Sequence, residues 1–167
     1  MPFTPFHFGP AAAVKAAIPK RFSFLIFCST QVFVDLESGY YLLRHEYPVH
    51  RFLHTFLGAT VAGLASGLIG MGLFRLAAVF APALRMTWGR AFASAFIGSI
   101  SHILLDSIMH RDMRPFAPFS DANPFLGLLR LPALHGLCIL VGILGAIAWL
   151  CLRFRRGLPD LSFRGSG

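Results

Sequence analysis

Charged side chains are scarce in this sequence, at 13% of its 167 residues, whereas soluble domains average roughly 25%. Hydrophobic residues make up 56% of the chain, and the mean hydropathy is +0.66. A single domain of this length cannot hide so much apolar surface in its own core. The composition therefore argues against a water-soluble domain and predicts that a lipid bilayer covers the chain. Eighteen Phe residues and so few charges also exclude intrinsic disorder.

Cysteine is equally rare in this chain. The three cysteines, Cys28, Cys138 and Cys151, all lie in apolar stretches, and no CxxC pair occurs. We expect small buried hydrophobic side chains at these positions, not disulfides or zinc ligands.

Acidic residues are few, since seven Asp and Glu stand against fifteen Lys and Arg, which gives a formal net charge of +8. Such an excess of basic charge is typical of nucleic-acid-binding proteins. Here, however, most basic residues flank apolar runs, where they set membrane topology, so we infer no nucleic-acid partner. Ten of them, such as Lys20, Arg90 and Arg155, fall on the side expected for the C-terminus. The positive-inside rule then predicts a cytoplasmic C-terminus.

Apolar runs of membrane-spanning length predict an all-α fold, an integral membrane helical bundle. Thr55 to Phe74 is uncharged over 20 residues, about 30 Å as a helix and enough to cross the hydrocarbon core. Two more spans are expected at Ala91 to about His110 and at Leu131 to Leu152. Phe22 to Val34 is shorter, and together with a short helix at Pro10 to Ala17 it predicts an N-terminal helical hairpin.

These elements amount to about four long helices plus a short N-terminal helix. We expect residues 1–156 to form one membrane-embedded domain with the lipid bilayer as its partner, and residues 157–167 to form a disordered basic tail. Gly63 and Gly67 in the first long span have the spacing that lets helices in lipid pack closely.

The scarce acids and histidines collect at one predicted membrane face. Ionisable groups within spans are rare and are by default candidates for function. They occur where the hairpin ends, where the first long span begins and where the third long segment ends, at Asp35, Glu37, His50, His54, His102, Asp106 and His110. His7 joins them if the short N-terminal helix runs away from that face and the next helix returns to it.

The spacing of these residues favours a metal site. His50 and His54 are four residues apart, so they would project from one helix face. In the third long segment, His102, Asp106 and His110 are also spaced by four and would share a face. Imidazole and carboxylate groups are ligands that suit zinc and related divalent metals. We therefore predict that this face holds a divalent metal, zinc first, with ligands drawn from these histidines and aspartates, above all His54, His102, Asp106 and His110.

Three arginines near the same face are candidate substrate ligands. Arg51, Arg111 and Arg114 could hold a phosphate bidentately, with His50 beside them. Snorkelling of the arginines to the membrane interface explains their positions equally well. Asp106 could also pair with Arg111 or Arg114 instead of binding a metal.

Other histidines and acids have simpler explanations. His45 and His135 have the positions of interfacial anchors. We expect Glu37, Asp112 and Asp121 to orient the ligands or to lie in loops.

Four short segments occur in a recognisable order. They read Thr4-Pro5-Phe6-His7, Asp35-Leu36-Glu37, His50-Arg51-Phe52-Leu53-His54-Thr55 and Ser101-His102-Ile103-Leu104-Leu105-Asp106. This combination resembles the LexA-binding, inner-membrane-associated family of metal-dependent hydrolases. More distantly, the order of histidines and aspartates resembles the zinc-dependent phospholipase C and single-strand nuclease superfamily, whose members cut phosphodiesters with a cluster of zinc ions.

The more distant resemblance implies a role for each matching residue. It makes metal ligands of His7, Asp35, His54, His102 and Asp106, with Asp106 as the bridging carboxylate. The later His and Glu ligands of that superfamily have no match beyond His110 and His135. One or two ions are therefore expected instead of three.

Together, the family resemblance and the predicted ligand cluster imply a membrane-bound, phosphodiesterase-like metal-dependent hydrolase in a bacterial inner membrane. Its expected catalytic residues are His54 and Asp106, and its expected substrate is a phosphoester or a lipid-linked ester at the membrane face. Two other classes stay open: a non-catalytic metal-binding or transport-related membrane protein, and a structural or partner-binding one. A transport path would place ionisable groups at several depths, whereas here they collect at one face.

Overall fold

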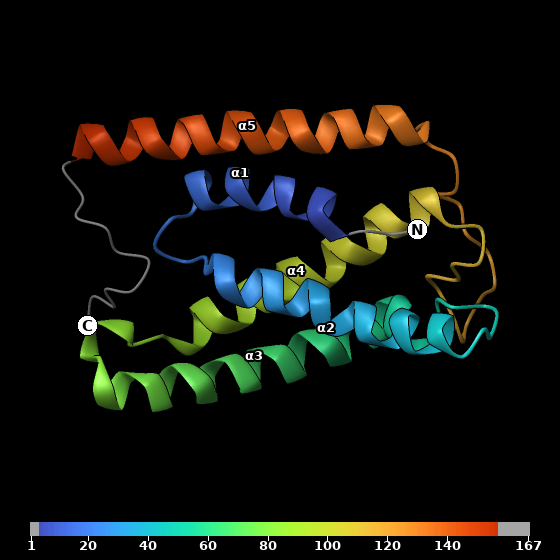
Figure 1. The fold of residues 1–167 in the computed structure, drawn as a ribbon, viewed down its shortest axis with the longest axis horizontal. Coiled ribbons are helices and arrows are strands. Elements are labelled where there is room, and N and C mark those ends of the chain that lie inside the picture. The colour runs from blue at the N-terminus through green and yellow to red at the C-terminus, as the bar shows by residue number, and fades with distance from the viewer. Residues whose placement is uncertain (1–3, 157–167) are drawn as a thin grey trace.

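The fold is built from α-helices throughout the described chain, as a computed structural model of residues 4–156 shows (Figure 1). The α-helices are α1 (Gly9–Ala17), α2 (Phe24–Leu43), α3 (Phe56–Phe80), α4 (Trp88–Met109) and α5 (Leu131–Arg156). Three 3-10 helices, η1 (Thr4–Phe8), η2 (Phe52–His54) and η3 (Pro82–Leu84), connect or precede them. No strand occurs in residues 4–156, so the predicted all-α class is confirmed. The predicted basic tail, 157–167, lies outside the described residues.

Three of the helices are long and apolar enough to cross a membrane. They are α3, α4 and the stretch Leu131–Arg155 of α5. Apolar side chains such as Leu68, Leu73 and Ile143 are more than half exposed on α3 and α5. Such surfaces suit lipid and not water, so they agree with the predicted spans.

Hydroxyl side chains define where the long helices begin. The side chains of Ser23, Thr55 and Thr87 cap α2, α3 and α4 by accepting hydrogen bonds from backbone N–H groups in the first turn. Such caps satisfy N–H groups that would otherwise have no partner. Thr55 directly follows His54, so the start of α3 also determines where that histidine is held.

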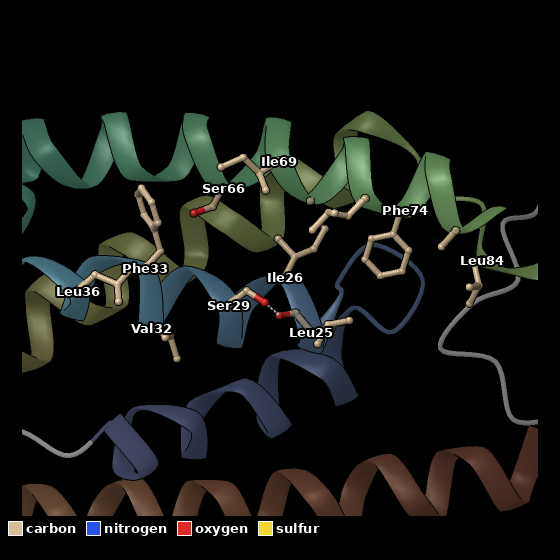
Figure 2. Close-up of a pocket in the computed structure, with 13 residues that line it drawn as sticks. Leu25, Ile26, Ser29, Val32, Phe33, Leu36, Ser66, Ile69, Phe74 and Leu84 are labelled. Carbon is tan, nitrogen blue, oxygen red and sulfur yellow. Dashed lines mark hydrogen bonds between the residues drawn. The ribbon is translucent and has the colours of Figure 1, made fainter. Parts of the chain in front are cut away.

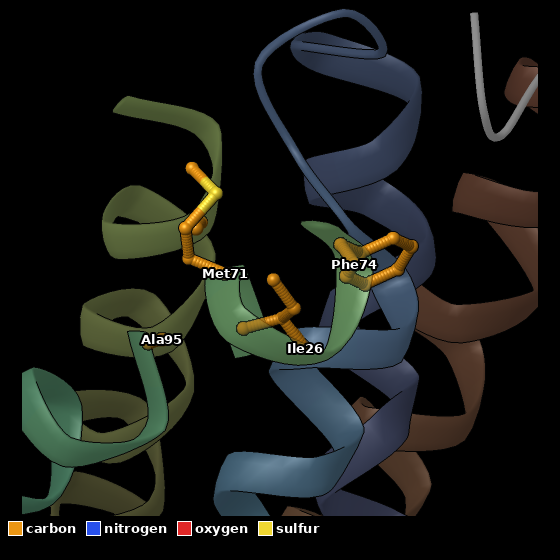
Figure 3. Packing of buried hydrophobic residues seen from close by; sticks show 5 residues of the cluster. Ile26, Met71, Phe74 and Ala95 are labelled. Atoms are coloured by element: carbon orange, nitrogen blue, oxygen red, sulfur yellow. The ribbon is translucent and has the colours of Figure 1, made fainter. Parts of the chain in front are cut away.

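The helices form two groups that meet near the N-terminus of the described chain. In Figure 1, α1 lies along α5, while α2, α3 and α4 form a three-helix layer beside this pair. Phe92 and Phe96 of α4 lie against Gly67 and Gly63 of α3, so these glycines accommodate aromatic rings. Ile26, Met71, Phe74 and Ala95 pack together at the other end of the layer (Figure 3).

Several expected boundaries were wrong. The second helix of the hairpin continues past Val34 to Leu43, so Asp35 and Glu37 lie within α2 and not at its end. His50 lies in the connection before η2 and His54 lies in η2, so the two do not share a helix face. Helix α3 starts only at Phe56, because Thr55 is the capping residue.

The cysteines are free, as expected, although their burial varies. Cys138 is buried and Cys28 is half-buried, whereas Cys151 is exposed on α5. The prediction of a buried side chain was therefore wrong for Cys151, because α5 leaves most of its surface uncovered by the rest of the chain.

Candidate metal centre

Two histidines and two aspartates meet at one end of the three-helix layer. His102 Nε2 lies 3.1 Å from Asp106 Oδ2 and 3.3 Å from Asp35 Oδ1. His54 Nε2 lies 3.8 Å from each of the same two oxygens. One atom from each of the four side chains lies within 4.8 Å of every other, close enough to share one metal ion. We call Asp35, His54, His102 and the Oδ2 atom of Asp106 the first ligand group.

A second set of imidazoles surrounds the other oxygen of Asp106. Asp106 Oδ1 lies 3.2 Å from His7 Nε2 and 3.9 Å from His110 Nε2. Ligand atoms of His50, Asp106 and His110 also lie within 4.8 Å of one another. We call His7, His50, His110 and the Oδ1 atom of Asp106 the second ligand group. The two oxygens of one carboxylate therefore face two different groups of potential ligands.

The atoms that face each other here are buried and lack hydrogen bonds. This is true of the Nε2 atoms of His7, His50, His54, His102 and His110, and of both carboxylate oxygens of Asp106. Buried polar atoms without partners are rare in proteins, because leaving them unsatisfied costs about 1–3 kcal/mol each. A cation between the imidazole nitrogens and the carboxylate oxygens would satisfy all of these atoms at once. The donor set therefore fits a divalent metal.

Three of the histidines are oriented through their other ring nitrogen. The contacts are His50 Nδ1 to Asp112 Oδ1 at 2.9 Å, His54 Nδ1 to Glu37 Oε2 at 3.4 Å, and His102 Nδ1 to Gln31 Oε1 at 2.5 Å. An oxygen at Nδ1 favours the tautomer that carries its proton there, which leaves the Nε2 lone pair directed into the cluster. Metal-bound histidines usually have such a partner.

The two orienting carboxylates also hold backbone segments in place. Glu37 Oε2 accepts a hydrogen bond from the backbone N–H of Leu53 at 2.8 Å. Asp112 Oδ2 accepts from the N–H groups of Val49 and His50 at 3.1 and 3.2 Å. The connection between α2 and α3 is thereby tied to α2 and to the segment after α4. These ties explain how histidines outside any long helix reach the cluster.

Burial and neighbouring charges change the acidity of the groups outside the spans. Burial lowers the pKa of His54, but the carboxylates of Asp35 and Glu37 outweigh burial and raise that pKa above 6.5. Burial and the neighbouring His54 lower the pKa of His50 despite its contact with Asp112. Burial likewise lowers the pKa of His110. The lowered pKa of His50 and His110 favours the neutral imidazole, the form that offers a lone pair to a cation.

The structure brings together every residue predicted as a metal ligand, and adds one. His7, Asp35, His54, His102, Asp106 and His110 all belong to the two ligand groups. His50, expected beside the substrate, instead lies in the second ligand group. Gln31 was missed at the sequence level, although it is the one amide in the apolar hairpin run.

The arginines and remaining histidines lie elsewhere. Arg51 pairs with Glu46 at 3.2 Å and stacks on the ring of Tyr41. Arg114 pairs with Asp121 at 3.0 Å in the solvent, and Arg111 is exposed. His135 stacks on Phe6 and His45 is exposed in the turn after α2. Among the described residues, the ion-pair partners of Asp106 are imidazoles, so the alternative of an Asp106–Arg pair was wrong.

Together, the contacts define a buried cluster of histidines and aspartates that could hold a metal ion. Comparison of the chain with protein-family models, curated proteins and solved structures finds no match. The assignment of a class therefore depends on the geometry of this cluster and on the helices that carry it.

Proposed function

We propose that this chain is a membrane-embedded, metal-dependent hydrolase that acts on a phosphoester or a lipid-linked substrate at one membrane face. The observation that carries the proposal is the position of Asp106. Its two buried oxygens each face a separate group of imidazole nitrogens that have no hydrogen-bond partner. One carboxylate placed in this way supports binding of one or two ions.

Charge and ligand type support zinc as the first candidate. The first ligand group offers two carboxylates and two imidazoles, so a divalent ion there would be balanced by the charge of the carboxylates. The second ligand group offers three imidazoles and shares Asp106. Nitrogen and oxygen donors of this kind suit zinc better than calcium or magnesium, which prefer oxygen ligands alone.

The proposed chemistry is hydrolysis. A divalent ion supplies a Lewis acid that polarises an ester oxygen and lowers the pKa of bound water. Asp106 and His54 hold the reacting region in place, because both are fully buried and are fixed by neighbouring side chains. Asp35 and Glu37 are 18% and 14% exposed, so the α2 side offers a route by which water and substrate reach the cluster.

The location of the cluster supports action at a membrane face. Its members come from η1, from the second half of α2, from η2 and the connection before it, and from the last turns of α4 with His110 directly after it. Helix α4 ends and α5 begins on the right of Figure 1. A transport path would need such ligands at several depths of the bundle, whereas the buried histidines and aspartates of the described residues lie in one cluster. With the C-terminus on the cytoplasmic side of an inner membrane, as the basic residues predict, the cluster lies at the extracytoplasmic face.

Hydrolysis of bis(p-nitrophenyl) phosphate in detergent, with added zinc or manganese, tests the proposal. We expect Asp106→Asn to lower kcat/KM at least about 100-fold, because both ligand groups lose their shared charge. His45→Ala is the matched control, since that histidine is exposed in a turn away from the cluster. Equal rates for the wild type and Asp106→Asn would refute the hydrolase.

A further inference from the structure

An apolar groove runs along the seam between α2 and α3. It encloses about 480 Å³, which lies within the range of small-molecule sites, roughly 300–1,000 Å³. Large side chains such as Phe33 and Phe74 form its walls, and the smaller Ser29 and Ser66 lie between them (Figure 2). The groove is partly open to the surroundings and is lined almost entirely by apolar side chains.

The few polar groups in this groove do not require a polar ligand. Ser29 Oγ donates a hydrogen bond to the Leu25 carbonyl oxygen of its own helix at 2.9 Å. On α3, a Cβ atom at Gly70 would lie 3.0 Å from Ile26 Cδ1, so the apolar side chain of Ile26 packs directly against the α3 backbone there. The groove is thus suited to an apolar occupant.

One end of the groove lies at the depth of the candidate metal centre. Leu36 lines that end and directly follows Asp35 of the first ligand group. The opposite end is lined by Leu84 in η3, beyond the far end of α3. From Leu25 to Leu36 the groove follows twelve residues of α2, which at about 1.5 Å per step is about 16 Å along the helix axis. It therefore extends from the level of the ligands well into the apolar part of the bundle.

We propose that the α2–α3 groove holds an acyl chain of the substrate, a lipid whose ester or phosphoester group lies at the metal centre. This inference rests on the proposed hydrolase function and names the substrate class. In a bilayer the groove gains little from the hydrophobic effect, because lipid tails are as apolar as leucine. The groove instead fixes the direction of the acyl chain. The ester or phosphoester group of the lipid then reaches the candidate metal centre in a defined orientation.

Photolabelling of the full chain in vesicles of phosphatidylethanolamine and phosphatidylglycerol tests the groove. The probe is phosphatidylglycerol with a diazirine at the end of one acyl chain, and peptide mapping should place the label near Phe74 and Leu84. A second probe, with the diazirine beside the chain's ester, should label the peptide around Leu36. Reversed positions, or uniform labelling of all lipid-facing helices, would overturn the proposal.

A matched pair of variants tests whether the groove itself holds the chain. Ser29→Phe fills the groove, whereas Thr60→Phe adds the same ring to α3 outside it. Both hydroxyls are exposed and bond to the carbonyl one turn earlier at 2.9 Å, so both substitutions remove the same interaction. We expect Ser29→Phe to reduce groove labelling at least about fivefold, or roughly 1 kcal/mol, with no change for Thr60→Phe. Equal labelling of the two variants would contradict the proposal.

Two further readouts separate this inference from the hydrolase proposal. Metal content and hydrolysis of the chain-free bis(p-nitrophenyl) phosphate are measured on the same samples. We expect both to be unchanged in Ser29→Phe, because Ser29 is not part of either ligand group. A wild type without metal-dependent hydrolysis contradicts the hydrolase, whereas uniform labelling of an active protein contradicts only the acyl-chain groove.

Discussion

The properties of single side chains decide whether the cluster binds a cation. Each of His50, His54 and His102 has an oxygen at Nδ1, and each has a buried Nε2 without a hydrogen bond. The oxygen fixes the ring orientation, so each Nε2 atom already points into the cluster before any ion binds. The folded chain has therefore already ordered these imidazole side chains, so binding an ion costs little further conformational entropy.

Glu37 is expected to act on metal binding through His54. Metal must displace the proton of His54, whose raised pKa makes the affinity fall as pH decreases through that pKa. Glu37→Gln removes one cause of the raised pKa, so the midpoint of the pH dependence should move to lower pH. The affinity at high pH should fall about 10–100-fold, because the ring loses its orienting carboxylate. Competition with a chromophoric chelator across pH measures both effects.

Glu46→Gln is the control for this change of charge. Glu46 pairs with Arg44 and Arg51 at the protein surface and does not contact a histidine of the cluster. We expect no shift of the midpoint for this variant. A Glu37→Gln profile that coincides with that of Glu46→Gln would show that Glu37 does not orient His54.

Substitution of His110 tests whether the second ligand group holds an ion of its own. We expect His110→Ala to lose the ion of the second ligand group and to keep an ion between His54 and His102, which lie on the other oxygen of Asp106. Inductively coupled plasma mass spectrometry of His110→Ala and His102→Ala would show the loss. Identical metal content in His110→Ala and the wild type would limit the centre to one ion.

The sequence predicted the candidate metal ligands but not the side chains that orient them. Ionisable residues such as His102 and Asp106 stand out in an apolar chain, because burying them without a purpose is costly. His50 was expected beside the substrate but lies in the second ligand group. This could not be predicted, because Asp112 holds His50 in the connection between α2 and α3, which has no regular periodicity. Gln31 is likewise recognised only when α2 packs against α4.

At the scale of the elements, the junction of η2 with α3 positions His54. Gly58 lies in the first turn of α3, where a Cβ atom would lie 2.6 Å from the carbonyl carbon of Phe52 and 2.8 Å from Leu53 Cα. Only glycine allows the two backbones to approach this closely. The close approach keeps His54, the next residue of η2, directed at Asp35 and Asp106.

Gly58→Ala is therefore expected to weaken metal binding and to lower stability. The backbone of η2 must move away from the new methyl group, and this displaces His54. Gly72→Ala is the control, because a Cβ atom there meets nothing within 4 Å, and helix propensity favours alanine by about 1 kcal/mol. Thermal unfolding and chelator competition measure the two effects. A Gly58→Ala protein with the metal affinity and midpoint temperature of Gly72→Ala would contradict this role.

The helices themselves were largely predictable, and their ends were not. Uncharged runs and basic flanks located α3, α4 and α5, because these patterns reflect local hydrophobicity. The extension of α2 from Val34 to Leu43 was missed, because Asp35 and Glu37 look like the end of an apolar run. Their side chains are instead placed by tertiary contacts with His54 and His102.

At the scale of the whole molecule, the end of α4, which is followed by His110 of the second ligand group, and the C-terminal end of α5 lie at opposite ends of the bundle. Basic residues concentrate toward the C-terminal end, so we expect that end to be cytoplasmic. A reporter fused after Arg156 should be active only as a cytoplasmic fusion, and one inserted after Phe119 should report the other side. An extracytoplasmic C-terminal reporter would reverse this orientation.

The surplus of positive charge is thus explained by topology, while the few acidic side chains explain the proposed chemistry. Asp35 and Asp106 belong to the first ligand group, and Glu37 and Asp112 contact its histidines or those of the second. Four of the seven acidic residues of the chain therefore lie in or beside the cluster. Such concentration in a bundle with apolar helices is what a cation site needs for charge balance.

Metal content is the most direct test of this account. Wild-type protein and the His102→Ala/Asp106→Ala double variant are purified identically, with His45→Ala as the control, and zinc, manganese and iron are measured per chain. The account predicts about one or two ions per wild-type or control chain, and close to none in the double variant, which loses His102 and the carboxylate that the two ligand groups share. The same sub-stoichiometric metal content in all three proteins would contradict the central claim.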